Sequence, residues 1–324
     1  MLHQTTILAL LALMVNGYKI PDEHSINYRP IIGVIAQESD SNLKQYGDTY
    51  IPAAYFQYIE MGGARGVPIL VQKDAEYYDK MFDSLNGILF PGGGVSLLIS
   101  GYAKAAKIFF DKAVKAYDSD GDYFPIWGTC MGFQILTAMT TGKDLLTYFD
   151  AEDIALPLKF SSDFEKSHLF KDLPEDVYQY LSKRNVTENF HHYGLEPSMF
   201  DATPDLNKFY RVLSTNEDRS GKEFISTMEA IKYPIYGTQW HPEKPNFQWN
   251  THYHINHGPD AIRVAQYFAS FLVDEARKSN HRFSTEEEEI DSLIQNYQPV
   301  YFHDQTFESM YFFNYTTNPR VNLN

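Results

Sequence analysis

The sequence predicts an α/β protein with three layers, in which helices cover both faces of a mostly parallel central sheet. Short apolar runs rich in β-branched residues alternate along the chain with segments whose apolar residues recur at helical spacing. This alternation is typical of parallel sheets, because a helix carries the chain back between two parallel strands. The chain has 324 residues, 44% of them hydrophobic, which is enough to bury the core of one large domain.

The elements of the first half follow this alternation in order. Apolar runs bounded by turn residues indicate strands, and Pro91 ends the third of them. Apolar residues at helical spacing indicate helices, the first of which stops before Gly62 and Gly63. We expect strands at 31–36, 67–71, 87–90 and 123–127, and helices at 50–61, 102–116 and 133–139.

The second half of the chain is less regular. Residues 147–181 mix polar and apolar side chains, and we expect an antiparallel excursion with loops there. Two β-rich runs, 223–228 and 235–240, are separated by a turn and predict a pair of strands. Residues 259–278 predict a helix, because their apolar side chains lie on one stripe.

The N-terminus predicts a signal peptide at residues 1–17. Residues 7–15 form an apolar run that has the length of a signal-peptide core and is too short to span a membrane. No lysine or arginine precedes the run, which departs from the usual pattern. Entry into the secretory pathway fits two N-glycosylation sequons, at Asn185 and Asn314, although such triplets also occur by chance. We therefore expect a secretory protein without stable membrane insertion.

The C-terminus differs in composition from the main domain, which we expect to span residues 18–283. Residues 284–324 form an extension that begins with an acidic run at 286–289 and continues as a segment rich in tyrosine and asparagine. We expect the acidic run to be a solvated surface. The last segment could wrap the domain or be disordered.

The charge and cysteine content exclude some classes of protein. The net charge is -15 and no basic run occurs in the chain, which argues against a nucleic-acid partner. A single cysteine excludes any disulfide within the chain, so stability must come from the core.

That single cysteine lies in the segment Gly128-Thr-Cys130-Met-Gly132. An apolar run precedes the segment and a helical pattern follows it, which is the arrangement of a nucleophile elbow. The turn would place the sulfur at a helix N-terminus, where the helix dipole favours a thiolate. We interpret Cys130 as a nucleophile, although most lone cysteines are small buried hydrophobic residues.

The segment Gln239-Trp-His-Pro-Glu-Lys244 contains candidate partners for this thiol. It follows a β-rich run, and residues two apart in extended chain point to the same side. Glu243 could then orient the imidazole of His241 and leave its other nitrogen to face a thiol. The alternative is an ordinary polar turn after an edge strand.

Three consecutive glycines follow the strand that Pro91 ends. Such a loop exposes backbone N–H groups, and we expect Gly93 to supply one donor of an oxyanion hole. The N–H of Met131, directly after the cysteine, would supply the other. A glycine-rich loop can also bind phosphate, but the ending Gly-Lys-Ser/Thr and the spacing Gly-x-Gly-x-x-Gly are both missing.

The histidines His252, His254 and His257 form a cluster in sequence. Their spacing is not one of the usual zinc-ligand patterns, and neither a second cysteine nor a clear carboxylate partner accompanies them. We expect no metal and no cofactor.

Taken together, the cysteine elbow, the Pro-Gly-Gly loop and the His-x-Glu pair resemble the class I glutamine amidotransferase-like superfamily. Within it, the chain is most similar to the γ-glutamyl hydrolases, over about residues 30–283. The segments that carry this resemblance are 30–34, 86–93, 123–133, 223–229 and 239–244. The resemblance implies hydrolysis of folate poly-γ-glutamates, a location in the lysosome or outside the cell, and a homodimer.

Three substrate-binding residues are implied by the same resemblance. His191, in Asn189-Phe-His-His, matches a histidine that lines the substrate site, although a surface or core histidine pair is the alternative. Tyr46 matches a tyrosine near the glutamate pocket. Gln134 stands where relatives often have glutamate, which puts the role of that position in doubt.

We therefore expect a cysteine hydrolase that cleaves γ-glutamyl bonds of folyl poly-γ-glutamates through a thioester. Cys130 would attack the γ-carbonyl carbon, and His241, oriented by Glu243, would move the proton. One alternative is a glutaminase that feeds ammonia to a synthetase. Another is an inactive relative that binds γ-glutamyl or folate compounds without cleaving them.

Overall fold

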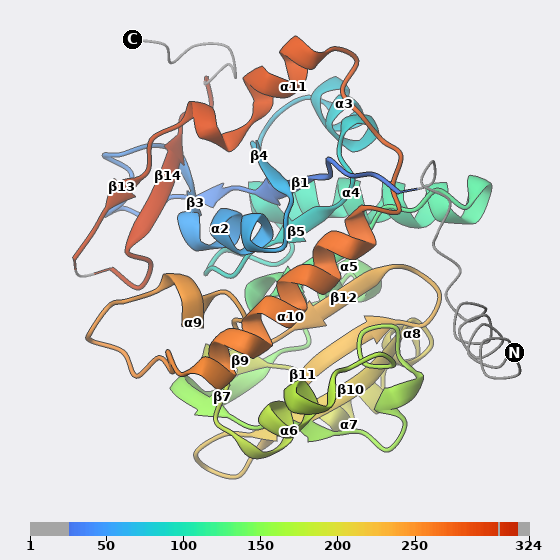
Figure 1. Cartoon of the computed structure of the whole chain (residues 1–324), viewed down its shortest axis with the longest axis vertical. Coiled ribbons are helices and arrows are strands. Elements are labelled where there is room, and N and C mark those ends of the chain that lie inside the picture. Colours follow the sequence, from blue (N-terminus) through green and yellow to red (C-terminus); the bar gives the residue numbers. More distant parts are fainter. Residues whose placement is uncertain (1–25, 304, 317–324) are drawn as a thin grey trace, which may run out of the picture.

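The computed structural model describes residues 26–303 and 305–316 (Figure 1). The expected signal peptide at 1–17 lies outside the described residues. The strands that make up the central sheet are, in spatial order, β4 (Arg65–Ile69), β1 (Ile31–Ile35), β5 (Ile88–Phe90), β6 (Ile126–Thr129), β12 (Ile235–Thr238), β11 (Glu223–Ala230), β10 (Tyr210–Glu217) and β8 (Lys159–Phe160). The first five are parallel, and the last three continue the sheet in antiparallel pairs.

Helices cover both faces of this sheet. The α-helices are α2 (Ala53–Met61), α3 (Ala75–Ser84), α4 (Gly101–Asp120), α5 (Met131–Thr141), α6 (Glu175–Lys183), α7 (Pro197–Asp201), α8 (Pro204–Asn207), α9 (Lys244–Phe247), α10 (Pro259–Ala276) and α11 (Glu286–Ser292). Within the described residues, two short 3-10 helices also occur, η2 (Phe164–Lys166) and η3 (Ile294–Asn296). Helix α10 packs against α2 and α6, while α4 packs against α3 and α5 on the opposite face (Figure 1).

Two hydrophobic clusters, one on each face, hold the layers together. In the parallel strands, successive side chains point to opposite faces and both faces are buried. Ile31 of β1 packs into the cluster with α3, α4 and α5, whereas Ile32 packs into the cluster with α2 and α10. The structure thus confirms the predicted three-layer fold with a mostly parallel sheet.

Several expected elements are also confirmed. The strand pair appears as β11 and β12, which are antiparallel. The excursion after residue 147 contains β7 (Thr147–Leu156), which pairs with β9 (Thr187–Gly194) in an antiparallel two-stranded sheet. Helices α3 and α6 were not anticipated. In the described part of the chain, no helix is long and apolar enough to cross a membrane.

The C-terminal extension wraps the domain through residue 316. It forms β13 (Val300–Tyr301) and β14 (Ser309–Phe313), which join β3 (Thr49–Pro52) and β2 (Gln37–Glu38) in a four-stranded sheet. The strand β14 runs antiparallel to β3. Residues far apart in sequence are thereby brought next to the carboxyl end of β1.

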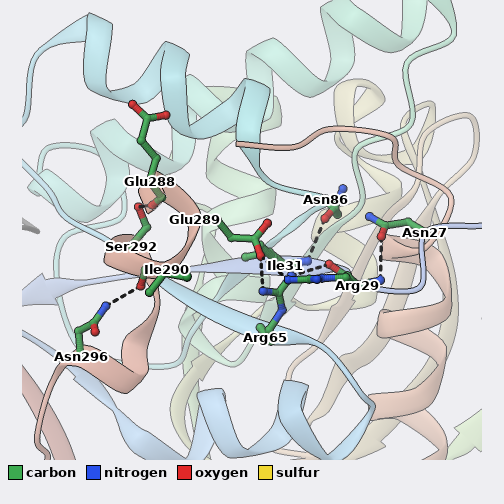
Figure 2. A network of polar contacts seen from close by, with 10 residues as sticks. All are labelled: Asn27, Arg29, Ile31, Arg65, Asn86, Glu288, Glu289, Ile290, Ser292 and Asn296. Carbon is green, nitrogen blue, oxygen red and sulfur yellow. Dashed lines mark hydrogen bonds and ion pairs between the residues drawn. The ribbon is translucent and has the colours of Figure 1, made fainter. Parts of the chain in front are cut away.

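The acidic run differs from the expectation of a solvated surface. It forms α11, in which Glu286 and Glu287 are exposed. Glu289, however, accepts hydrogen bonds from Arg29 at 3.0 Å and Arg65 at 2.5 Å (Figure 2). These ion pairs fasten the start of the extension to the amino ends of β1 and β4.

Candidate active site

The cysteine stands on a strained turn between β6 and α5. Cys130 has φ 53° and ψ −110°, a backbone conformation that is rare for a residue with a side chain. Its N–H donates to the backbone oxygen of Thr238 on the neighbouring strand at 2.8 Å. A Cβ on Gly132 would lie 1.9 Å from the backbone oxygen of Phe90, so only glycine fits there. The packing of the turn therefore fixes the sulfur at the carboxyl edge of the sheet.

Three adjacent parallel strands deliver the expected groups to this same edge. Strands β5, β6 and β12 lead into the glycine loop, Cys130 and His241, respectively. Carboxyl ends of parallel strands meet at one edge of a sheet, where α/β proteins place their ligand sites. The segments that are distant in sequence are thus adjacent because β5 pairs with β6 and β6 with β12.

His241 and Glu243 form a buried pair. The Nδ1 atom of His241 lies 2.6 Å from Oε1 of Glu243, and each residue is at most 2% exposed. Residue 243 already has helical dihedral angles, so the pair forms across a turn and not along extended chain. With Nδ1–H donated to the carboxylate, Nε2 is the free nitrogen, and it has no hydrogen-bond partner among the described residues.

The environment of His241 favours the imidazolium form. Burial lowers the pKa of His241, but the charges of Glu243 and Cys130 and hydrogen bonds raise it, with the net result at about 9. An imidazole that keeps its proton beside a sulfur stabilises a thiolate–imidazolium pair. The geometry and the charge can therefore activate the thiol.

Two hollows adjoin this group, and Gly93 lines both. The first hollow, about 240 Å³ in volume, is lined by Cys130, His241 and Lys244 among others. The second hollow, about 350 Å³ in volume, is lined by Met131 and by several valine and leucine side chains. The other lining residues of the first hollow are Asp40, Leu43, Tyr50, Phe190, Gln305, Thr306, Phe307 and Met310, and those of the second are Gly94, Val95, Ser96, Leu97, Leu98, Gln134, Asp144, Leu146 and Tyr193.

Lys244 was missed by the sequence analysis as a member of the site. Its side chain is fully buried, and Nζ has no hydrogen-bond partner in the part of the chain that the structure describes. The ammonium lies 4.1 Å from the ring centre of Phe190 and 5.0 Å from that of Phe307. Burial lowers the pKa of Lys244, while the charges of Glu243 and Cys130 oppose that change. Its position directly after the His-x-Glu pair was the signal that could have revealed it.

The C-terminal extension supplies one wall of the first hollow. Phe307 follows β13 and packs near Lys244, and Thr306 contacts the hydroxyl of Tyr253 at 3.1 Å. Nothing in the composition of this tyrosine-rich segment indicated a place beside the cysteine. This wall was therefore not predicted from the sequence.

The structure brings Gln134 to the site but places the other two expected substrate residues outside both hollows. Gln134 donates to the backbone oxygen of Tyr193 at 2.8 Å and lies in the second hollow. His191 is a buried residue of β9 whose ring packs against Phe224, and its ring nitrogens lie 3.0 Å from the backbone oxygen of Tyr193 and 3.2 Å from Oδ1 of Asn189. Burial lowers the pKa of His191 to about 3, which favours the neutral ring. On the same strand, Phe190 is the residue that faces Cys130.

Tyr46 lies against the C-terminal extension. It is 44% exposed, and its ring centre is 5.1 Å from that of Phe302 and 5.3 Å from that of Phe312. Its neighbours Asp40 and Leu43 reach the first hollow in its place.

The sequons and the histidine cluster lie at the surface. Asn185 and Asn314 are both exposed. His254 pairs with Asp153 at 2.7 Å, and His257 contacts the backbone oxygen of Pro245 at 2.8 Å. Within residues 26–303 and 305–316, no group of three histidine, cysteine or acidic side chains could hold a metal ion.

Comparison with known proteins shows the family to which the chain is similar. A sequence model of the family Peptidase C26 matches residues 30–243. The chain is 45% identical to the human γ-glutamyl hydrolase over 288 residues, which cover 88% of this chain and 90% of that protein. It is 44% identical to the γ-glutamyl hydrolase of Rattus norvegicus, with the same coverage of both chains. Among solved structures, a glutamine amidotransferase from Methylobacillus flagellatus matches with a TM-score of 0.45 and 9% identity, over 79% of this chain and 97% of that one.

Proposed function

The chain belongs to the peptidase C26 family, and on that premise we propose that it hydrolyses γ-glutamyl bonds of folate poly-γ-glutamates through a thioester on Cys130. The observation that carries this proposal is the convergence of one strained, buried cysteine with a histidine whose Nδ1 is bound to a carboxylate. The relatives are cysteine-type γ-glutamyl hydrolases by family and by name, and this chain carries the parts that such chemistry needs.

The reaction divides into two steps at the same thiol. The Cys130 sulfur attacks the γ-carbonyl carbon while the imidazole of His241 holds the thiol proton. The N–H groups of Gly93 and Met131 stabilise the negative oxygen of the tetrahedral intermediate. When the carbon–nitrogen bond breaks, His241 gives its proton to the leaving amine. Water then attacks the thioester carbon, loses a proton to His241, and releases the acid product and the thiol.

The lining of the two hollows supports one orientation of the substrate. The leaving nitrogen must receive a proton from His241, which lines the first hollow and not the second. The leaving glutamate therefore occupies the first hollow, beside Lys244. The acyl group then lies in the second hollow, next to Met131 and Gln134, where leucine and tyrosine side chains suit an aromatic pteroyl moiety.

Lys244 is the cation that would pair with a carboxylate of the negatively charged substrate. The protein has a net charge of -15, so its overall field repels a polyglutamate tail. A buried ammonium with no hydrogen-bond partner among the described residues is a favourable partner for a carboxylate. We assign Lys244 to a carboxylate of the leaving glutamate.

Mass spectrometry of the products tests the proposed function. Purified protein and the Cys130→Ala variant are each incubated with a folyl poly-γ-glutamate at acidic and at neutral pH. The proposal requires shortened folates, with released glutamate or glutamyl peptides, from the native protein and none from the variant. Intact polyglutamate together with cleavage of free glutamine would instead make the chain a glutaminase. If neither reaction occurs, the chain is a binding protein without catalytic activity.

The secretory route, the lysosomal or extracellular location and the dimer belong to the proposal as well. They rest on the apolar run at 7–15, on the exposed asparagines at 185 and 314, and on the family. Treatment of the secreted protein with a glycosidase should lower its mass. The mass of the double variant Asn185→Gln and Asn314→Gln should not change on glycosidase treatment. If the mass of the native protein does not change either, the prediction of N-glycosylation is contradicted.

A further inference from the structure

A buried glutamine forms hydrogen bonds with two residues of the glycine loop at the candidate oxyanion hole. Gln37 lies in β2, at the carboxyl end of β1, and is 1% exposed. Its Nε2 donates to the backbone oxygen of Gly92 at 2.9 Å, and its Oε1 accepts from the N–H of Gly94 at 3.4 Å. The amide therefore spans the residue between them, Gly93. Because one contact needs a donor and the other an acceptor, only one orientation of the amide satisfies both.

The bond to Gly92 controls the direction of the next N–H. The oxygen of Gly92 and the N–H of Gly93 belong to one peptide unit, which is planar and trans. In such a unit the C=O and the N–H point in opposite directions. As long as Gln37 holds the oxygen of Gly92, the N–H of Gly93 points away from Gln37.

The other N–H groups of the loop are already paired. The N–H of Gly92 donates to the hydroxyl of Tyr55 at 2.8 Å, and that of Val95 donates to the sulfur of Met131 at 3.2 Å. With Gly94 bound to Gln37, the N–H of Gly93 is the one amide in this loop without a partner in the described chain. It belongs to the residue that lines both hollows beside Cys130.

The packing shows how closely the glutamine is fitted. A Cβ on Gly93 would lie 2.0 Å from Oε1 of Gln37. A residue other than glycine would displace the amide, so the glycine and the glutamine depend on each other. A flexible triple-glycine loop is thereby held in one conformation at the place where the reaction needs a fixed donor.

We propose that Gln37 is a positioning residue for the reaction: it fixes the peptide between Gly92 and Gly93 so that the N–H of Gly93 is aimed at the oxyanion. The proposal rests on the proposed function, because it assumes an acyl intermediate on Cys130. Gln37 itself touches neither hollow among the residues described. Its effect passes through the backbone of the loop.

Three variants test the role of Gln37. Gln37→Leu removes both hydrogen bonds, and we expect kcat to fall by about 10- to 100-fold with KM changed by less than about threefold, since loss of a whole donor costs about 10²–10³. Gln37→Glu keeps the acceptor but loses the donor at neutral pH. Its introduced carboxyl group regains a donor when protonated, so the ratio of its kcat to that of the native protein should rise by about fivefold or more on acidification. Gln266→Glu, on the exposed face of α10, makes the same chemical change elsewhere and should not alter kcat.

A second readout separates positioning of the donor from damage to the fold. Alkylation of Cys130 by iodoacetamide needs the thiolate but no oxyanion hole, so its rate should be the same in Gln37→Leu and in the native protein. Binding of a γ-glutamyl aldehyde, whose adduct places an oxyanion in the hole, should weaken in parallel with kcat. An unchanged kcat in Gln37→Leu, or an alkylation rate that falls with kcat, would overturn the proposal. Failure of the proposed function itself would appear separately, as turnover retained by Cys130→Ala.

Discussion

Among single residues, Lys244 destabilises the folded protein but is placed to bind a carboxylate of the substrate. A buried cation without a hydrogen-bond partner among the described residues lowers the free energy of unfolding, because its hydration is lost without full compensation. The same unmet charge attracts a carboxylate. Residues of this kind are expected where function and stability compete.

Substitution of Lys244 should therefore affect binding and stability in opposite directions. In Lys244→Met, we expect KM for a polyglutamate to rise by about 10- to 100-fold, since a buried charged hydrogen bond is worth about 1.5–3 kcal/mol. The free energy of unfolding should be unchanged or higher. Steady-state kinetics and urea unfolding measure the two effects. Lys208→Met removes an exposed lysine and serves as the control, and a Lys244 variant that is less stable with an unchanged KM would refute the assignment.

The charge of Glu243 should appear in the pH dependence of stability. Burial lowers the pKa of His241, but the charges of Glu243 and Cys130 raise it to about 9 from 6.5. A group whose pKa is higher in the folded state stabilises the fold fully below its unfolded pKa, and this contribution disappears as pH rises through the folded pKa. Stabilisation by the imidazolium is thus complete below about pH 6.5 and lost by about pH 9.

Glu243→Gln should remove much of that stabilisation. Relative to the native protein, the variant should be less stable by on the order of 2–3 kcal/mol near pH 6, and the difference should shrink toward about pH 9.5. Its kcat should fall by about 10²-fold or more, but less than in Cys130→Ala, because Glu243 orients the base and does not react. Urea unfolding at both pH values measures the effect, with the exposed Glu165→Gln as the control. A difference that is independent of pH would contradict it.

At the scale of elements, α11 links the amino end of the sheet to the wall of the active site. Glu289 is paired with Arg29 and Arg65 (Figure 2). From α11 the chain continues through β13 toward β14 (Figure 1), and residues 305–307 between these two strands line the first hollow. Burial raises the pKa of Glu289, but hydrogen bonds and charges of the two arginines lower it below its ordinary value. A lowered pKa stabilises the fold above the unfolded pKa, and the effect disappears as pH falls through the folded value.

Glu289→Gln should loosen the extension at neutral pH and have a smaller effect in acid. We expect a loss of about 1 kcal/mol or less, since Arg29 is largely exposed and its pair is screened. Limited proteolysis should cut residues 298–313 faster in the variant at about pH 7, and the difference should shrink as the pH falls below the usual glutamate pKa of about 4.3 and through the lower pKa of the folded state. Glu287→Gln, at an exposed position of the same helix, is the matched control. Equal proteolysis of both variants would show that α11 does not anchor the extension.

The elements also show where sequence reasoning succeeds and where it fails. The cysteine turn and the His-x-Glu pair were predicted because each is a local pattern at the end of a strand. The side of β9 that faces the site was not predictable from the sequence. Successive side chains of a strand point to opposite faces, and His191 packs against Phe224 of β11 while Phe190 faces the cysteine. Which of the two faces the cysteine depends on how the β7–β9 pair lies against β11, and this packing between distant segments leaves no local signal in the chain.

For the whole molecule, the parallel half of the sheet followed from the alternation of apolar runs and helical patterns. The wall contributed by Phe307 and the position of Tyr46 did not, since both depend on the pairing of β14 with β3, which are far apart in sequence. Long-range pairing of this kind leaves no periodic signal in the chain. Lys244 lay within a recognised motif, but its burial depends on this same wall.

The overall charge gives a prediction that concerns the whole molecule. A protein with a net charge of -15 repels a polyanionic substrate, and salt screens this repulsion over about 10 Å at 0.1 M. We expect kcat/KM for a long polyglutamate to rise by a few-fold between about 10 and 150 mM salt. The rise should be smaller for a substrate with a single γ-linked glutamate. A kcat/KM that falls with added salt would mean that local positive charge outweighs the global field.

In the proposed reaction Cys130 carries the acyl group as a thioester, and this intermediate can be trapped. The native protein is mixed with a γ-glutamyl anilide whose good leaving group makes acylation faster than hydrolysis, and the mixture is quenched in acid. Because the chain has one cysteine, peptide mapping by mass spectrometry assigns a thioester without ambiguity. We expect the peptide that contains Cys130 to gain the mass of the acyl group less the one hydrogen that the thiol loses. Release of the aniline with the acyl group on another residue, or with no adduct on Cys130 during the burst, would contradict it.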